Sequence, residues 1–315
     1  MHVDLLLATG HVLEQALNES YSLWGEGLSR PDYGRYNAAQ LRTEWGAASL
    51  ARVALVEDGR LLATAKRYDL VARLGGQPRP MLGIGAVFTP PDLRRRGLAR
   101  ELIERMIEDA AARRVTGALL FSEIGPDYYA RLGFSIVEVG DVTFEIPAGR
   151  GTPAIPMRSG DDRDVARIAE ISARMTERFR FALERPAAFI QYGLTKKRLL
   201  AGLTPGTARQ VGFFVVEEGA QPAAYIVMTV TPRGPTLEEC GDRDPSGARV
   251  GAMLQAYAAA SREDALRLNA WLPPGFCPPQ LSIVRRAPAR DVMMTRGIDP
   301  PLRTAEVGYW HGDIF

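Results

Sequence analysis

The fold class that the sequence predicts is α/β (α+β), with two similar halves that each carry a mixed, mostly antiparallel sheet flanked by helices. A length of 315 residues favours two domains of about 150 residues each. Residues 81–122 have the pattern of a strand, a helix and a strand, and a similar order of elements returns in the second half. The segment Pro147–Pro156 is rich in Pro and Gly and separates the two series, so we expect domains at 1–150 and 151–315.

The first half opens with a strand at residues 3–8 and a helix at 11–28, where apolar residues recur at helical spacing. Farther along, the turn Asp58-Gly59 joins two apolar runs and predicts a hairpin over residues 51–69. The polar stretch between helix and hairpin is interpreted as a packed excursion, with a lid over a substrate as the alternative. Its aromatic residues are Tyr33, Tyr36 and Trp45.

The centre of the first half is the run from residue 81 to residue 88, which has almost no polar side chain and predicts a strand buried on both faces. A helix with one apolar face follows from Leu98, and residues 117–122 form the next strand, so the crossover is expected to be right-handed. A short helix closed by Gly133 and strands over 134–146 complete the predicted domain.

The second half repeats this order at low residue identity. Residues 210–231 predict a hairpin, residues 237–240 a counterpart of the central strand, 249–260 a counterpart of its helix and 266–272 the strand after it.

An arginine-rich segment begins the helix after the central strand. The first N–H groups of a helix lack partners and carry partial positive charge, so anions bind there. Arg94, Arg95 and Arg96 add positive charge, and Gly97 lets the backbone approach a phosphate closely. The segment therefore predicts a site for the diphosphate of a nucleotide-like cofactor. The sequence has no P-loop and no complete Gly-x-Gly-x-x-Gly motif, which excludes those two phosphate-binding motifs.

Two motifs at the expected separation make the first 150 residues resemble the GCN5-related N-acetyltransferase (GNAT) superfamily. Arg94-x-x-Gly97-x-Ala99 fits its acetyl-CoA loop, and Tyr129-x-x-x-Gly133-Phe134 fits its Tyr-x-x-x-Gly-Phe segment. The resemblance implies that acetyl moves from the cosubstrate acetyl-CoA to a primary amine of a small molecule or peptide by direct attack in a ternary complex, with Tyr129 as general acid. It implies these cofactor-binding residues: Val87, Phe88, Thr89, Arg94, Arg95, Arg96, Gly97, Leu98, Ala99, Arg100 and Ser122.

The pair of halves is similar to the Eis-type acetyltransferases, but the chain ends where those proteins continue into a sterol-carrier-like domain. The second half has Asp242 and Asp244 where a diphosphate would lie, so we expect a degenerate domain that shapes the acceptor pocket.

The catalytic base is left open. An alkylamine is mostly protonated at neutral pH and must lose a proton before it attacks a thioester. Many members of the superfamily have a glutamate in the central strand, whereas residues 81–88 contain none. The candidates are Glu123, Asp127, the C-terminal carboxylate of Phe315 and a chain of water molecules. A non-catalytic acyl-CoA-binding regulatory module is therefore the alternative function.

Composition narrows the partners. The net charge of +2 offers no broad surface for nucleic acid, and Cys240 and Cys277 lie too far apart for a zinc motif, so we expect no metal. Both cysteines lie in the second half, which disfavours an acyl-cysteine intermediate. No long apolar run and no basic leader are present, so we expect a cytoplasmic protein without a membrane partner. The expected partner is a small-molecule amine, and homo-oligomerisation is left open.

Overall fold

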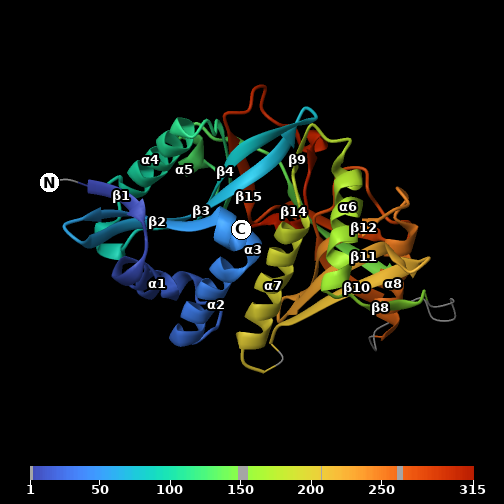
Figure 1. Ribbon diagram of the computed structural model, residues 1–315. Helices are drawn as coiled ribbons and strands as arrows, with labels where there is room; N and C mark the ends of the chain where they lie inside the picture. The colour runs from blue at the N-terminus through green and yellow to red at the C-terminus, as the bar shows by residue number, and fades with distance from the viewer. Residues whose placement is uncertain (1–2, 148–154, 207, 261–264) are drawn as a thin grey trace. The chain divides into compact units, whose positions relative to one another are not determined.

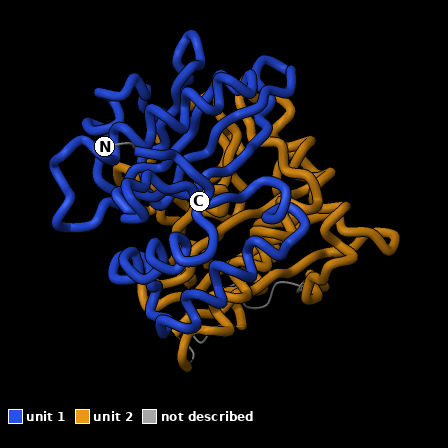
Figure 2. The backbone as a smooth tube through the Cα atoms, turned by 60° about the vertical axis from the view of Figure 1, so that its left-hand side comes forward, with its two compact units in different colours: residues 1–138, 291–303, 315 blue, residues 139–290, 304–314 orange. Residues whose placement is uncertain are grey.

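A computed structural model describes residues 3–147, 155–206, 208–260 and 265–315 (Figure 1). The chain forms two compact units (Figure 2). Unit 1 consists of Met1–Glu138, Asp291–Arg303 and Phe315, and unit 2 consists of Val139–Arg290 and Thr304–Ile314.

Unit 1 has a mixed sheet in the order β1-β2-β3-β4-β5-β15-β6, in which β4 and β5 are parallel and the other neighbours are antiparallel. Its strands are β1 (Val3–Leu7), β2 (Leu50–Glu57), β3 (Arg60–Leu74), β4 (Gln77–Phe88), β5 (Gly117–Ser122), β6 (Ser135–Ile136) and β15 (Val292–Arg296). Its helices are α1 (Gly10–Trp24), α2 (Arg30–Arg42), α3 (Glu44–Ser49), α4 (Leu98–Ala112) and α5 (Asp127–Ala130).

Successive side chains of the strands point to opposite faces of this sheet, and helices cover both faces. On one face, the apolar side of α4 packs on the sheet, with Leu102 and Ile103 fully buried against strand residues such as Leu55 and Leu82. On the other face, α1 packs on Ala54 and neighbouring apolar residues of β2 and β3. The sheet therefore has a helix layer on each side, which matches the predicted class.

The polar stretch after α1 folds into α2 and α3. Tyr33 and Tyr36 are buried, and Trp45 stacks on Tyr68 with 6.4 Å between ring centroids. These contacts confirm the interpretation as a packed excursion.

Unit 2 repeats the arrangement with a sheet in the order β14-β7-β13-β12-β11-β10-β8. The strands of this sheet are β7 (Gly140–Pro147), β8 (Met157–Ser159), β10 (Gln210–Glu218), β11 (Gln221–Thr231), β12 (Gly234–Asp242), β13 (Ala265–Ala270) and β14 (Ser282–Pro288). Two short strands of unit 2 outside this sheet, β9 (Phe181–Leu183) and β16 (Val307–Gly308), pair with each other in parallel. The helices of unit 2 are α6 (Val165–Thr176), α7 (Ala187–Leu203) and α8 (Ala248–Ala260). β12, α8 and β13 form the parallel crossover, which confirms the predicted counterpart of the strand, helix and strand in unit 1.

The boundary between the units differs from the one expected at residue 150. Unit 2 begins at Val139, because β7 pairs with β13 and β14 and its residues Phe144 and Ile146 lie in the core of unit 2. In unit 1 the place beside β5 is taken by β15, whose Met294 is fully buried. The strand β7, expected in the first sheet, thus belongs to the sheet of unit 2, and β15, from near the end of the sequence, lies between β5 and β6 in unit 1.

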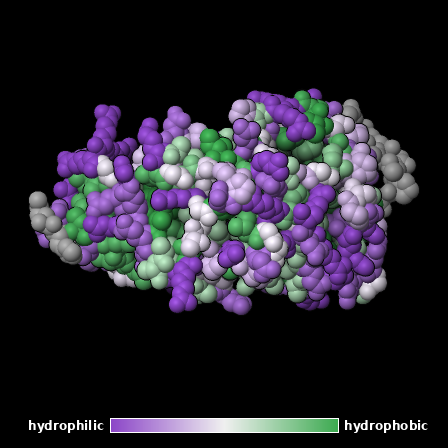
Figure 3. All heavy atoms as spheres, turned by 90° about the horizontal axis from the view of Figure 1, so that it is seen from above, coloured by the Kyte–Doolittle hydropathy of each residue, from purple (hydrophilic) through white to green (hydrophobic). Residues whose placement is uncertain are grey.

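Hydrophilic residues cover much of the face seen in Figure 3, with smaller hydrophobic areas between them. No helix of the described residues is long and apolar enough to cross a membrane.

Candidate active site

The parallel strands β4 and β5 separate toward their carboxyl ends. They pair from Met81 with Gly117 to Ile84 with Leu120, while β4 continues to Phe88. The pairing of β3 with β4 shifts between Thr64 and Lys66, which inserts one extra residue into β4. Ala86 in this bulge has a φ of +48°. A bulge bends its strand and interrupts the ladder, so the backbone around Val87 lies at an opening between the two strands.

The loop after β4 presents backbone N–H groups at the start of α4. Arg95 and Gly97 have φ values of +65° and +81°, and left-handed residues next to right-handed ones direct successive N–H groups into one concavity. The first helical hydrogen bond runs from Glu101 N to Gly97 O at 2.9 Å, and no side chain caps the helix. The preceding amides are therefore available to an anion.

The arginines expected to bind the diphosphate lie at the rim of this concavity. Arg94, Arg95 and Arg96 are all exposed. Nε of Arg94 donates to the carbonyl oxygen of Thr89 at 3.2 Å, which ties the loop to the end of β4. Oγ1 of Thr89 is buried and has no hydrogen-bond partner among the described residues. These features fit the predicted binding segment.

The corresponding helix of unit 2 is closed to anions. The Asp242 carboxylate accepts hydrogen bonds from the backbone N–H groups of Arg249 and Val250, at 2.9 and 3.4 Å, and from the Arg249 guanidinium. A carboxylate of the chain itself therefore occupies the start of α8. Of the two crossover helices, only α4 has a start without such a cap.

Tyr129 lies in α5 and is 8% exposed. Its ring makes edge contacts with Tyr128 and Phe134, with centroids 5.1 and 6.1 Å away. Gly133, with a φ of +79°, turns the chain so that Phe134 N donates to Tyr129 O at 3.1 Å. Burial, followed by the effect of Tyr128, raises the pKa of Tyr129 to about 12, so its hydroxyl keeps its proton at neutral pH.

Three other candidate residues lie in or next to the loop after β5, and they differ in exposure. Ser122 is buried and its Oγ donates to Gly125 O at 2.6 Å, so the hydroxyl shapes the loop. Glu123 and Asp127 are exposed.

Phe315 lies over β4 on the face opposite α4. A Cβ atom at Gly85 would lie 3.1 Å from the main-chain oxygen of Phe315 and 3.3 Å from its carboxyl carbon. At Gly83 a Cβ atom would lie 2.9 Å from Cζ of the Phe315 ring. The ring contacts Tyr68 of β3 and Phe121 of β5, with centroids 4.4 and 5.3 Å away.

Two glycines therefore make room for the C-terminal residue on the central strand. Gly83 and Gly85 are two residues apart and face the same side, as strand alternation requires. The strand has no carboxylate of its own, and the carboxyl group of Phe315 lies against it. The spacing of the two glycines is the sequence signal for this arrangement, although from the sequence it indicated only an incomplete dinucleotide motif.

Neither cysteine lies in unit 1. Cys240 is fully buried in β12 and burial raises the pKa of its thiol, whereas Cys277 is exposed. Across the described ranges, no group of three or more His, Cys, Asp or Glu residues could hold a metal ion.

The fold is that of an α/β protein with two similar mixed sheets, one in each unit. Residues 11–137 match the family model described as an acetyltransferase (GNAT) domain. Unit 1 thus contains a GNAT domain, and the two sheets of the chain have the fold of tandem GNAT-like structures.

Solved structures share this fold at low sequence identity. A GCN5-related N-acetyltransferase from Anabaena variabilis is 15% identical, with a TM-score of 0.68 over 94% of this chain and 72% of that chain. Eis1 from Mycobacterium abscessus is 16% identical, with a TM-score of 0.54 over 94% and 73%. Saccharomyces cerevisiae N-myristoyltransferase with bound myristoyl-CoA is 11% identical, with a TM-score of 0.56 over 96% and 84%. A search of curated proteins finds no match.

Proposed function

We propose that the protein is an N-acetyltransferase that moves acetyl from acetyl-CoA to a primary amine, with unit 1 as the catalytic domain. The observation that carries the proposal is the contrast between the two helix starts. The start of α4 is uncapped and rimmed by arginines, while Asp242 closes the start of α8. An acyl-CoA diphosphate needs the first arrangement and is repelled by the second.

The opening between β4 and β5 supports the same cosubstrate. The bulge at Ala86 exposes backbone groups near Val87 to an extended ligand such as a pantetheine arm. The yeast N-myristoyltransferase of similar fold has myristoyl-CoA bound, which favours an acyl-CoA ligand for this fold.

The Phe315 carboxylate is our candidate for the base. Its position at Gly85 supplies the negative charge that the central strand lacks. In the proposed reaction the amine nitrogen bonds to the acetyl carbon, the carbon–sulfur bond breaks, and the carboxylate takes the proton that nitrogen loses. Glu123 is the weaker candidate, because it is exposed on its loop.

Tyr129 acts on the leaving sulfur as a hydrogen-bond donor in this scheme. Its pKa of about 12 lies about 3.5 pH units above that of an ordinary thiol near 8.5, so complete proton transfer would cost about 5 kcal/mol. We therefore expect the hydroxyl to stabilise the departing thiolate and to leave its final protonation to solvent.

A non-catalytic acyl-CoA-binding module is the competing function. Steady-state release of CoA thiol with a panel of primary amines separates the two. Turnover that depends on amine concentration supports the enzyme, and acetyl-CoA binding without turnover for any amine overturns it. That unit 2 shapes the acceptor pocket stays a prediction.

A further inference from the structure

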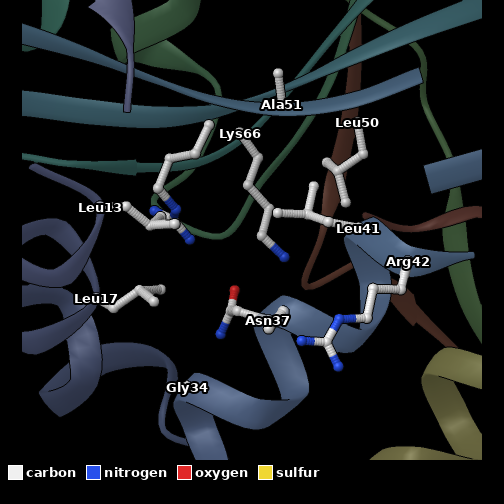
Figure 4. A pocket seen from close by; sticks show the side chains of 11 residues that line it. Leu13, Leu17, Gly34, Asn37, Leu41, Arg42, Leu50, Ala51 and Lys66 are labelled. Carbon is white, nitrogen blue, oxygen red and sulfur yellow. The ribbon is translucent and has the colours of Figure 1, made fainter. Parts of the chain in front are cut away.

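A cavity of about 280 Å³ lies in unit 1 between α1, α2, β2 and β3 (Figure 4). The residues that line it share no member with the segments assigned to acetyl-CoA or with Phe315. They are Leu13, Leu17, Gly34, Asn37, Ala38, Leu41, Arg42, Leu50, Ala51, Arg52 and Lys66.

The charges of this cavity are all positive. Arg42, Arg52 and Lys66 line it, and no Asp or Glu is among the lining residues. In Figure 4 the ends of the Lys66 and Asn37 side chains point into the space between α2 and the strands. A ligand in this position meets positive charge from two strands and one helix.

Among the residues that line the cavity, Arg52 is unusual because its charged side chain is buried. It is 6% exposed, and neither terminal nitrogen of its guanidinium, Nη1 or Nη2, meets the distance and angle of a hydrogen bond among the described residues, although the Tyr33 hydroxyl lies near the group. Burial lowers the pKa of Arg52, and the neighbouring Tyr33 and Tyr68 oppose that effect. A buried cation whose donors are not matched by acceptors is costly, so the arrangement calls for an anion.

The register of the sheet places a second cation directly opposite. Arg52 of β2 pairs with Lys66 of β3, so the two side chains leave the same face of the sheet. Lys66 Nζ donates to Gln40 Oε1 at 3.2 Å. Like charges directly opposite each other on neighbouring strands destabilise a sheet, and one anion between them removes that penalty.

We propose that this cavity binds a small organic carboxylate with a compact apolar body. The flat fork of the Arg52 guanidinium matches the two oxygens of a carboxylate. The leucines that line the rest of the cavity contact the hydrocarbon part; they are Leu13, Leu17, Leu41 and Leu50. The volume of about 280 Å³ equals that of about nine liquid water molecules, which limits the ligand to a short chain or a single ring.

Isothermal titration calorimetry with hexanoate tests the proposal without any assay of acetyl transfer. Hexanamide removes the charge, hexylamine reverses it, and inorganic phosphate removes the apolar body. We expect hexanoate to bind at millimolar concentrations or below, and at least tenfold more tightly than each of the other three. No detectable binding of hexanoate at about 10 mM, or equal binding of phosphate, overturns the proposal.

Two kinds of variant locate the site. Arg52→Met removes the fork, and Gly34→Leu fills the cavity from α2, where a Cβ atom meets nothing within 4 Å. Each is expected to weaken hexanoate binding at least tenfold. The matched controls are Arg163→Met, at a side chain that is 86% exposed, and Gly193→Leu, at a helix glycine of α7 with equally open space. Gly34→Leu keeps every charge, so unchanged hexanoate affinity in that folded variant overturns the assignment.

Discussion

Adding one glycine after Phe315 tests the proposed base most directly. The addition turns the carboxyl group at Gly85 into an amide carbonyl and moves the carboxylate about 3.8 Å along the chain. The ring contacts with Tyr68 and Phe121 remain, and each aromatic pair contributes about 0.5–1.5 kcal/mol. About 1–3 kcal/mol therefore still holds the last residue in place, while the proton acceptor is lost.

We expect the turnover rate to fall at least about 100-fold, because general-base catalysis commonly contributes about 10²–10⁴-fold. The KM for acetyl-CoA should stay within threefold and the Tm within about 2 °C, since the start of α4 and the ring packing are unchanged. Initial-rate kinetics with varied amine and acetyl-CoA, together with thermal unfolding, provide these values.

Enzymatic conversion of the added glycine to a C-terminal amide of Phe315 provides the matched variant. It keeps the ring and the chain length and removes only the charge, so it should lose as much activity as the extended chain. The control Phe315→Leu keeps the carboxylate and loses the ring contacts, and its turnover rate should fall less than tenfold. Retention of a third or more of the wild-type turnover rate by both the extended and the amidated chains would refute the base assignment.

Three further predictions concern the donor, the loop and unit 2. Tyr129→Phe should lower the turnover rate about 10–100-fold with little change in acetyl-CoA affinity, whereas Tyr128→Phe should leave the turnover rate unchanged. Because the pKa of Tyr129 is about 12, a pH–rate profile should show no loss of rate from its ionisation below about pH 11. Gly97→Ala forces a side chain into a φ of +81° and should weaken acetyl-CoA binding about 5–30-fold in a calorimetric titration. The control Gly59→Ala, with a φ of +78° in the β2–β3 turn, should lower stability by a similar amount and leave the affinity unchanged. An equal loss of affinity in both variants would contradict the assignment of the loop to acetyl-CoA. Burial alone would raise the pKa of Glu238, but Lys197, His311 and Thr229 outweigh it and hold that pKa at about 2 instead of 4.5. Ionised Glu238 therefore contributes about 3 kcal/mol to the free energy of unfolding, which is present above pH 4.5 and lost as pH falls toward 2. Urea unfolding between about pH 2 and 6 should show a flatter pH dependence of this free energy in Glu238→Gln, and an unchanged slope would contradict the explanation.

Local patterns in the sequence predict most of the fold of unit 1. The Asp58-Gly59 turn predicts the β2–β3 hairpin, and the change from an apolar run to helical spacing predicts β4 and α4. These signals lie within a few residues of the structure they specify, so they can be identified without knowledge of tertiary contacts.

The features that could not be predicted from the sequence depend on partners distant in the chain. β15 is a five-residue strand whose place beside β5 is set by pairing across about 170 residues, which no local pattern encodes. The contact of Phe315 with Gly83 and Gly85 likewise joins residues more than 200 positions apart in the sequence. Arg52 is the one polar residue between Leu50 and Val56 of β2, and its burial depends on α1 and α2 packing over that face.

The two strands β7 and β15 also set an order for folding on the ribosome. Chains emerge from the N-terminus, and early domains generally fold first. Unit 1 cannot complete its sheet in this way, because the strand between β5 and β6 ends at Arg296 of a 315-residue chain. Until β15 has emerged, the edge of β5 that β15 covers has no partner in this sheet. The sheet of unit 1 is therefore completed only after the strands of unit 2 up to β14 have been synthesised.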